Sequence, residues 1–331
     1  MALSIGAVAG QVLGGVLVSA DLWGSGWRPI FLINLPVGAA IMLAALRFLP
    51  EHQSGKRERL DLWGVATLSL TVLLVVLPLT LGHTQHWPMW TWICLAASVA
   101  PATAFIMVER RVAGRDGRPL VDLQLVTQPA IAWTLIASGL ALTTYFSLLF
   151  TLALYLQEGL GKTALYSGLA LVSWVAAFGV GGPVVPHMPT RFTRFVAPFG
   201  YLVLAASYGA IGASLYTGYG GGPVLLVLLG FGGLGLGVGV TANIRQMTAA
   251  VSPRHAPDMS GIITTTGQLA GVAGIAAFGT LYFSLISRPG PIASTHAFVV
   301  VVTGFALIAL VAAAAAYRSG QASSVKQGAP P

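Results

Sequence analysis

The groups of this chain that could carry a proton are few, and none of the carboxylates lies in the middle of an apolar segment. Nine residues are acidic. They lie at the ends of apolar segments or in the polar stretches between them: Asp21, Glu51, Glu58, Asp61, Glu109, Asp116, Asp122, Glu158 and Asp258. A carboxylate buried at the centre of such a segment would be a candidate for proton transfer or cation binding. We expect no carboxylate of this chain to have that role.

Neutral polar and aromatic residues inside the apolar segments are the remaining candidates for lining a cavity. They are Asn34, Tyr145, Tyr155, Gln157, Asn243, Gln246, Thr265 and Gln268. Amide, hydroxyl and phenol groups of this kind can contact an amphiphilic ligand. They can equally form hydrogen bonds between helices, which contribute ~0.6 kcal/mol on average in membrane proteins. Both interpretations stay open from the sequence.

Three other patterns suggest chemistry that the surrounding sequence does not support. Gly230, Gly232 and Gly235 fit the G-x-G-x-x-G spacing of a dinucleotide site, but they lie in a long apolar run with no strand before it. His83 and His86 do not by themselves complete a metal site. The single cysteine, Cys94, cannot form a disulfide within the chain. No nucleophile, base and orienting group converge, so we expect neither an enzyme nor a cofactor.

The composition indicates that the chain is embedded in a membrane. The chain is 56% hydrophobic and 8% charged, whereas soluble domains carry about 25% charged residues. The net charge of +8 is explained by the basic residues that favour cytoplasmic loops, so no nucleic-acid partner is expected. We predict an all-α polytopic membrane protein embedded in the lipid bilayer.

The apolar runs predict about ten membrane-spanning helices, because a helix needs ~20 mainly apolar residues to cross a bilayer. They are residues 3–20, 29–49, 62–82, 90–108, 131–156, 164–187, 196–216, 224–250, 260–285 and 297–317. If the N-terminus is cytoplasmic, 14 of the 17 basic residues lie on the cytoplasmic side of the membrane, and only Arg28, Lys162 and Arg288 lie on the other side. This bias supports the number of helices and predicts a multi-pass inner-membrane protein with both termini in the cytoplasm.

Two longer polar stretches divide these helices into groups of two, two and six. We expect a helix pair in 1–50, a cytoplasmic loop in 51–60, a second pair in 61–108, a cytoplasmic loop in 109–130, a six-helix bundle in 131–317 and a disordered cytoplasmic tail in 318–331. The first helix carries glycine at positions 6, 10 and 14, a spacing that lets helix backbones approach closely. We therefore expect Gly10 to be a packing position.

The first 38 residues carry two motifs of a known family. The segment with Gly6, Gly10, Gln11, Gly14 and Gly15 resembles the antiporter signature G-x3-G-P-x2-G-G, with Gln11 at the position of the proline. The motif W-R-x-x-F-x-x-N-x-P-x-G is matched by Trp27, Arg28, Phe31, Asn34, Pro36 and Gly38. With the stretches 145–171 and 233–281, they make the chain similar to the fourteen-helix drug/proton antiporters of the major facilitator superfamily.

The resemblance implies an architecture and a function. Residues 1–317 would correspond to helices five to fourteen: an incomplete N-terminal bundle, two linker helices and a complete six-helix C-terminal bundle. The first helix would face segment 164–187 across the interface between the bundles. The chain would then belong to a multidrug efflux transporter that exports small amphiphilic or lipophilic compounds by alternating access, driven by the proton gradient, and that confers drug resistance.

The resemblance also implies that this chain lacks a four-helix N-terminal portion, which would be a partner of these ten helices and would hold the coupling carboxylate. On that basis we expect the chain alone to be incompetent for proton-driven export. The alternative is a membrane fragment that does not transport, derived from a truncated or misannotated gene.

Overall fold

Helices make up all the regular structure of the described chain. The computed structural model describes residues 2–20, 24, 26–48, 62–82, 85, 87–114, 126–189, 192–218, 222–249, 256–286 and 290–327, and no strand occurs in these ranges. The helices are α1 (Ala2–Ala20), α2 (Pro29–Leu32), α3 (Asn34–Phe48), α4 (Leu62–Leu81), α5 (Met89–Ala97), α6 (Val99–Ala113), α8 (Pro129–Leu154), α9 (Ala164–Val184), α10 (Thr193–Tyr216), α11 (Pro223–Ala249), α12 (Ala256–Leu285) and α13 (Pro291–Gln327). A π-helical turn, η2 (Tyr155–Gly159), follows α8, and a 3₁₀ turn, η3 (Val185–His187), follows α9. The all-α prediction is confirmed.

Nine helical segments of the described chain are long and apolar enough to cross a membrane. They correspond to nine of the ten predicted spans. The remaining predicted span, 3–20, is the 19-residue helix α1, which is not among the nine. The chain is thus a polytopic helical membrane protein.

Two predicted spans are each divided in two, and proline explains both divisions. A proline lacks the N–H that would bond to the carbonyl four residues earlier. Helix α2 ends at Leu32, four residues before Pro36, and α5 ends at Ala97, four residues before Pro101. The chain continues in each case after one residue as α3 and α6. The sequence contains these prolines, but Pro78 lies inside the unbroken helix α4, so a proline alone does not predict a break.

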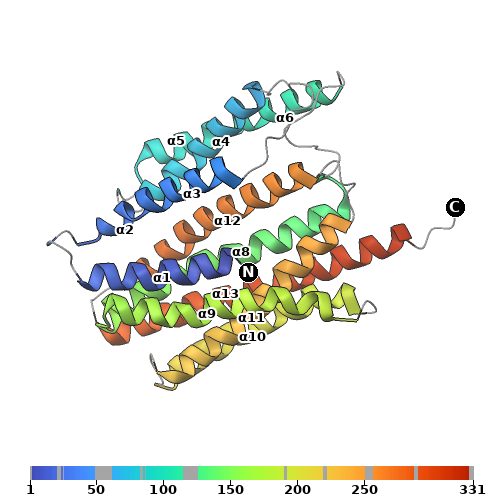
Figure 1. The fold of residues 1–331 in the computed structure, drawn as a ribbon. Coiled ribbons are helices and arrows are strands. Elements are labelled where there is room, and N and C mark those ends of the chain that lie inside the picture. Colours follow the sequence, from blue (N-terminus) through green and yellow to red (C-terminus); the bar gives the residue numbers. More distant parts are fainter. Residues whose placement is uncertain are drawn as a thin grey trace.

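Helices α8 to α13 form one bundle with a common core (Figure 1). The main contacts join α10 to α13 and α11, α9 to α11, and α8 to α12 and α13. The largest fully buried side chains in this core include Trp174, Tyr201, Tyr208, Phe298 and Phe305. Aromatic side chains bury large areas and so contribute strongly to packing. Two of these rings pack directly on glycines of α11, since a Cβ atom added at Gly232 would collide with the Trp174 ring and one added at Gly239 with the Tyr201 ring.

Glycines bring the backbone of α11 into contact with two neighbouring helices. A Cβ atom added at Gly237 would collide with the carbonyl oxygen of Phe178 in α9. A Cβ atom added at Gly235 would lie 2.6 Å from the carbonyl oxygen of Gly200 in α10. Small residues permit this close approach of membrane helices. The glycine-rich run is therefore used for packing against α9 and α10.

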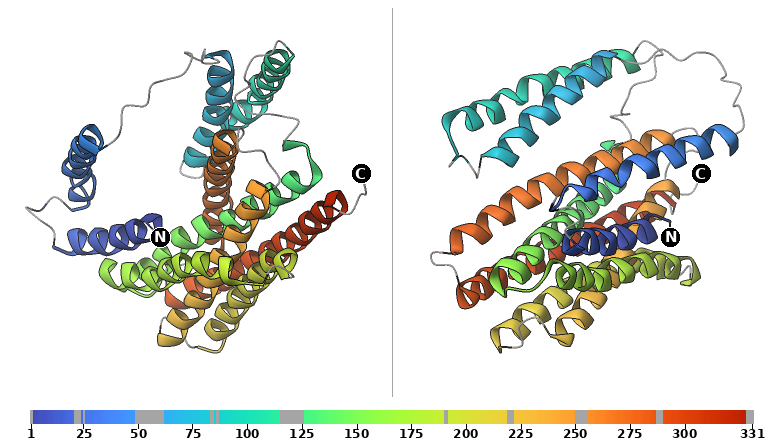
Figure 2. Two further views of the ribbon diagram at one scale, coloured as in Figure 1. Left: turned by 45° about the vertical axis from the view of Figure 1, so that its right-hand side comes forward. Right: turned by 60° about the vertical axis from the view of Figure 1, so that its left-hand side comes forward.

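The N-terminal helices are less enclosed than the bundle. Helix α1 packs against α9, the partner expected from the sequence. Helix α3 has no buried residue, and its main helical contact is with α2. Helices α4, α5 and α6 form a separate group beyond α12, which α4 contacts (Figure 2).

Helix α13 extends past the predicted start of the disordered tail, as far as Gln327. Extending an existing helix costs less than nucleating a new one. The extension is also attached to α8, because the Ser319 hydroxyl lies 2.7 Å from Thr134 Oγ1 and donates a 2.9 Å hydrogen bond to the carbonyl of Ala130. The polar composition of this segment indicated disorder, but these contacts order its first part.

Candidate functional site

A buried polar cluster joins three helices of the bundle. The Asn243 amide nitrogen on α11 donates hydrogen bonds to the hydroxyl of Tyr201 on α10, at 2.9 Å, and to Ser138 Oγ on α8, at 3.2 Å. Asn243 and Tyr201 are fully buried. The Asn243 amide oxygen has no hydrogen-bond partner among the described residues. A buried polar atom left without a partner costs about 1–3 kcal/mol, so this oxygen is available to a donor that enters the bundle.

A glycine makes room for the ring that reaches this cluster. A Cβ atom added at Gly239 on α11 would lie 2.6 Å from the ring of Tyr201. Any larger residue at this position would push the phenol away from Asn243, which is one helical turn further along α11. The same glycine-rich helix thus supplies both the close packing and the amide of the cluster.

A second buried group lies between α9, α10 and α11. The indole of Trp174 stacks on the ring of Tyr208 with centroids 5.7 Å apart. Its Nε1 atom has no hydrogen-bond partner among the described residues. Ser207, beside Tyr208 in sequence, donates a 2.6 Å hydrogen bond to the Leu228 carbonyl of α11. The Tyr208 hydroxyl also has no hydrogen-bond partner among these residues, so the group is mainly a packing core with two unused donors.

Helix α12 carries an exposed polar row. Ser260, Thr264 and Gln268 follow one another at four-residue intervals and are all exposed. Further along the same face, α12 packs on α8: a Cβ atom added at Gly271, seven residues after Thr264, would lie 2.6 Å from the Phe146 ring. Polar side chains facing lipid are unfavourable. An exposed polar row on a spanning helix therefore indicates a surface that meets water, a ligand or another polar segment.

The structure does not bring the eight predicted cavity residues into one cluster. Asn243 lies in the buried cluster, whereas Tyr155 lies on the far part of the α8–η2 segment, 17 residues after Ser138, or on the order of 25 Å along a helix axis. Thr265 is half-buried and Gln268 exposed, both on α12. Asn34 is exposed at the start of α3, away from the bundle core.

Two aromatic candidates differ in their surroundings. Tyr145 on α8 is half-buried, and its ring packs on Phe178 of α9 with centroids 5.7 Å apart. Tyr155 is fully buried and stacks on Phe298 of α13 at 4.6 Å, with its hydroxyl 3.4 Å from Thr295 Oγ1. The Tyr155 ring is therefore part of the core.

The two predicted glutamines have different environments. Gln157, in the turn η2, is exposed. Gln246 on α11 donates a 3.0 Å hydrogen bond to the Thr193 carbonyl at the start of α10. This bond joins α10 to α11, one of the two roles that the sequence left open.

The family motif from Trp27 to Gly38 lies mainly on the surface. Trp27 is 62% exposed and Phe31 64% exposed, and their rings meet edge to face with centroids 5.6 Å apart. The Arg28 guanidinium lies 5.8 Å from the Trp27 ring centroid. Asn34, Pro36 and Gly38 are exposed on α3. The motif therefore makes local contacts and presents several of its side chains outward.

The glycines of the antiporter signature lie on different sides of α1. A Cβ atom added at Gly15 would lie 3.4 Å from the Cα atom of Leu165 in α9. Cβ atoms added at Gly6, Gly10 or Gly14 would meet nothing within 4 Å. The packing role of these three glycines stays a prediction. The side chains of Gln11 and Asp258, and the residues His83 and His86, lie outside the described part of the structure.

Sequence reasoning missed two members of the buried cluster, Ser138 and Tyr201. Serine and tyrosine are common in membrane helices, so neither is conspicuous alone. Their depth could have identified them: Ser138 is nine residues beyond the start of α8, Tyr201 is eight beyond the start of α10, and Asn243 is six before the end of α11. Helix α11 is antiparallel to α8 and α10, so a position six residues before its end lies at a depth in the bundle similar to that of positions eight or nine residues after the starts of α8 and α10.

A bundle of spanning helices with buried polar side chains and an exposed polar row defines a polytopic membrane protein. Residues 1–275 match the Major Facilitator Superfamily, and the chain belongs to that superfamily. The resemblance inferred from the glycine signature and the W-R-x-x-F motif is confirmed.

Similar proteins are named as a transporter, an export protein and a drug resistance protein. The chain is 32% identical over 290 residues to a probable actinorhodin transporter of Streptomyces coelicolor, covering 86% of this chain and 50% of that protein. It is 30% identical over 306 residues to the cephamycin export protein CmcT of Amycolatopsis lactamdurans, covering 88% and 60%. It is 26% identical over 286 residues to the multidrug resistance protein Stp of Mycobacterium tuberculosis, covering 86% and 51%. The chain thus spans about half the length of the curated relatives it matches.

Proposed function

We propose that this chain forms the C-terminal bundle, the linker helices and part of the N-terminal bundle of an exporter of small amphiphilic compounds. The relatives named as an actinorhodin transporter, a cephamycin export protein and a multidrug resistance protein support this proposal. The transport mechanism is alternating access, in which helix bundles rock around a site near the middle of the membrane. The proton gradient supplies the energy.

The observation that carries the proposal is the contrast between two exposed surfaces of the bundle. The row of Ser260, Thr264 and Gln268 on α12 is polar. The exposed side chains of α13 include Leu307, which is 61% exposed, and Leu310, which is 47% exposed. Leucine is suited to lipid, whereas hydroxyl and amide groups are suited to an aqueous path. The α12 row therefore lines the translocation path, and the α13 surface faces lipid.

The orientation follows from the distribution of basic residues. Arg110 and Arg111 lie in the last turn of α6, and Arg194 lies in the first turn of α10. These helix ends belong to the side on which most lysine and arginine residues fall. Cytoplasmic loops carry this excess, so both termini are cytoplasmic and the membrane is the plasma membrane of the cell.

Cysteine labelling tests the polar path. In a Cys94→Ser background, which removes the single native cysteine, Gln268→Cys should react with a membrane-impermeant maleimide in vesicles. Leu307→Cys is the matched control, because Leu307 is also exposed in the structure but faces lipid, and it should react much more slowly. Ethidium, an amphiphilic cation, should protect Gln268→Cys from labelling. Equal reaction of both cysteines, or no reaction at position 268, would contradict the proposed path.

Proton coupling is tested by an efflux assay. The acidic residues of the sequence lie at segment ends and in loops, so coupling requires a carboxylate from outside these 331 residues. Vesicles that contain only this chain should show no ethidium efflux sensitive to a protonophore. Protonophore-sensitive efflux from such vesicles would overturn this part of the proposal.

A further inference from the structure

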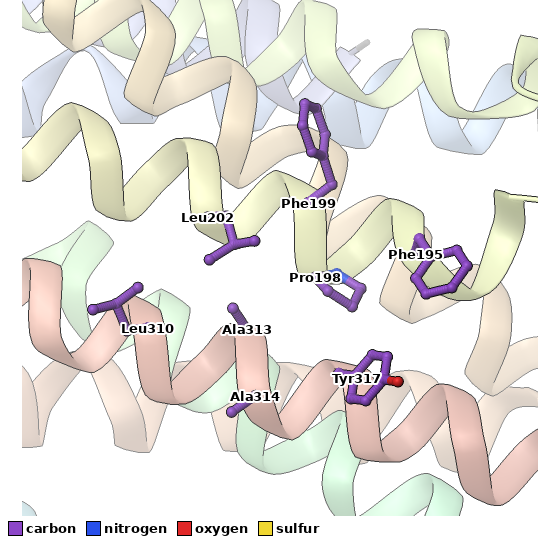
Figure 3. A pocket seen from close by; sticks show the side chains of 8 residues that line it. All are labelled: Phe195, Pro198, Phe199, Leu202, Leu310, Ala313, Ala314 and Tyr317. Carbon is purple, nitrogen blue, oxygen red and sulfur yellow. The ribbon is translucent and has the colours of Figure 1, made fainter.

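A groove lies on the outer side of the bundle, between α10 and α13. Its volume is about 510 Å³, and its lining is almost entirely apolar. The residues that line it are Phe195, Pro198, Phe199, Leu202, Leu310, Ala313, Ala314 and Tyr317 (Figure 3). All belong to membrane-spanning segments. The groove therefore opens to the lipid and is separate from the polar row of α12.

The groove exists because small residues alternate with large ones. Pro198 and Ala313 are buried and form its floor, and Ala314 is small and exposed. Leu202 on α10 faces Ala313 on α13, Leu310 lies about one turn before Ala313, and the rings of Phe195 and Tyr317 lie further along in the other direction (Figure 3). These two rings stack with centroids 6.3 Å apart. The groove is therefore apolar along its length and has two aromatic rings at one end.

The two helices are in close contact beyond the aromatic end. A Cβ atom added at Gly320 of α13 would lie 3.1 Å from the carbonyl oxygen of Arg194 in α10. Pro198 has no N–H to donate to that carbonyl, which lies four residues before it. The approach of Gly320 to Arg194 closes the groove at this end, so an occupant enters from the lipid side.

A cation lies at the aromatic end of the groove. The Arg194 guanidinium lies 4.5 Å from the centroid of the Phe195 ring, which is itself part of the lining. Arg194 is exposed, and no carboxylate of the described residues pairs with it. It is also in the first turn of α10, where the helix dipole favours an anion. Guanidinium groups bind phosphate well because their donors match its oxygens.

We propose that this groove binds one anionic phospholipid, with an acyl chain along Leu202, Leu310 and Ala313 and the phosphate on Arg194. The apolar channel and the cation at its end match the two parts of such a lipid. The orientation proposed above puts the Arg194 end in the cytoplasmic leaflet, where anionic lipids attract basic residues. Tyr317 lies at the depth where tyrosine is enriched in membrane proteins, between chains and headgroups.

Native mass spectrometry of the full chain in detergent tests this proposal. The probes are dioleoylphosphatidylglycerol, which is anionic, and dioleoylphosphatidylcholine, which has the same acyl chains and no net charge. The wild-type chain should retain one phosphatidylglycerol in preference to phosphatidylcholine. Arg194→Gln should weaken phosphatidylglycerol retention about fivefold, the effect of one basic residue near an anionic headgroup.

Two further variants distinguish binding in this groove from nonspecific attraction of anionic lipid to basic residues on the surface. Ala314→Trp fills the groove from its exposed side and should remove the retained lipid. Arg318→Gln is the matched control, because its guanidinium lies over Trp133 of α8, 5.1 Å from the ring centroid, and not over the lining of the groove. Arg318→Gln should retain phosphatidylglycerol as the wild type does. If Ala314→Trp does not fold, Arg194→Gln against Arg318→Gln still decides the question.

Several results would overturn the proposal. Equal retention of both lipids by the wild type would remove the anionic specificity. Equal losses in Arg194→Gln and Arg318→Gln would show attraction by surface charge alone. A dimer that Ala314→Trp dissociates, without any lipid preference, would assign the groove to a second copy of the chain. A phosphatidylglycerol with a photoreactive acyl chain should label α10 and α13 near Leu202 and Leu310, and labelling elsewhere would also count against the site.

Discussion

The amide nitrogen of Asn243 lies 2.9 Å from the hydroxyl oxygen of Tyr201, and both side chains are fully buried. With Ser138, they join α8, α10 and α11 by side-chain hydrogen bonds. The Asn243 amide oxygen has no partner among the described residues. The cluster is thus both a joint between three helices and a site where one acceptor remains available.

Asn243→Ala should destabilise the bundle by about 1 kcal/mol, because two interhelical hydrogen bonds disappear and the Tyr201 hydroxyl loses a partner. Thermal unfolding in detergent measures the change. Tyr201→Phe and the double variant complete a cycle, and their effects should not add, because the two residues share one bond. Additive effects would show that Asn243 and Tyr201 act independently. Gln268→Ala, an exposed change, is the control and should leave the transition temperature unaltered.

Gly237→Leu should prevent correct packing of α9 on α11, since any Cβ atom there collides with the Phe178 carbonyl. Overpacking typically costs about 1–3 kcal/mol, and a backbone collision belongs at the upper end of that range or above it. Gly230→Leu is the matched control on the same helix, because a Cβ atom at Gly230 meets nothing within 4 Å. The yield of monodisperse protein after size-exclusion chromatography compares the two. Similar yields would contradict the backbone contact at Gly237.

Gly15→Leu should loosen the contact of α1 with α9, whereas Gly10→Leu should not, because only Gly15 approaches Leu165. The measurement is the rate at which Leu165→Cys, in the Cys94→Ser background, reacts with a maleimide. The rate should rise in Gly15→Leu and stay constant in Gly10→Leu. A rise in Gly10→Leu alone would show that the regular glycine stripe, and not Gly15, forms the contact in the membrane.

Ser319→Ala should release the end of α13 from α8 at a cost of about 1 kcal/mol, because hydrogen bonds to Thr134 and to the Ala130 carbonyl are lost. Hydrogen exchange of the amides after residue 319 should become faster. Thr303→Ala is the control on the same helix, since Thr303 is exposed and bonds only to the Val299 carbonyl of its own turn. Unchanged exchange in Ser319→Ala would mean that the extension is held by other contacts.

The helices and the family could be predicted from the sequence because both depend on local patterns. Long apolar runs identify spanning helices, and the residues from Trp27 to Gly38 carry a family motif that needs no tertiary structure. The break at Ile33 was not predicted: Pro36 removes one hydrogen bond, but Pro78 lies inside the unbroken helix α4, so a proline alone does not locate a break. The continuation of α13 to Gln327 was missed because it depends on the bonds of Ser319 to another helix.

The contacts of glycines and buried polar groups could not be predicted in the same way. The spacing of Gly6, Gly10 and Gly14 indicates a face of α1 but not which face meets α9. Asn243 was recognised as a candidate, but its partners lie 105 and 42 residues away in the sequence. Their meeting depends on how deep each helix sits and how it is rotated, and one sequence does not specify these quantities.

The backbone contacts of α11 determine how this bundle responds to force. Where helices meet through side chains, rotamer changes can absorb a small displacement. Gly237 against Phe178 and Gly235 against Gly200 provide no such cushion. A displacement of α11 is therefore transmitted directly to α9 and α10, and the three helices move as one rigid body.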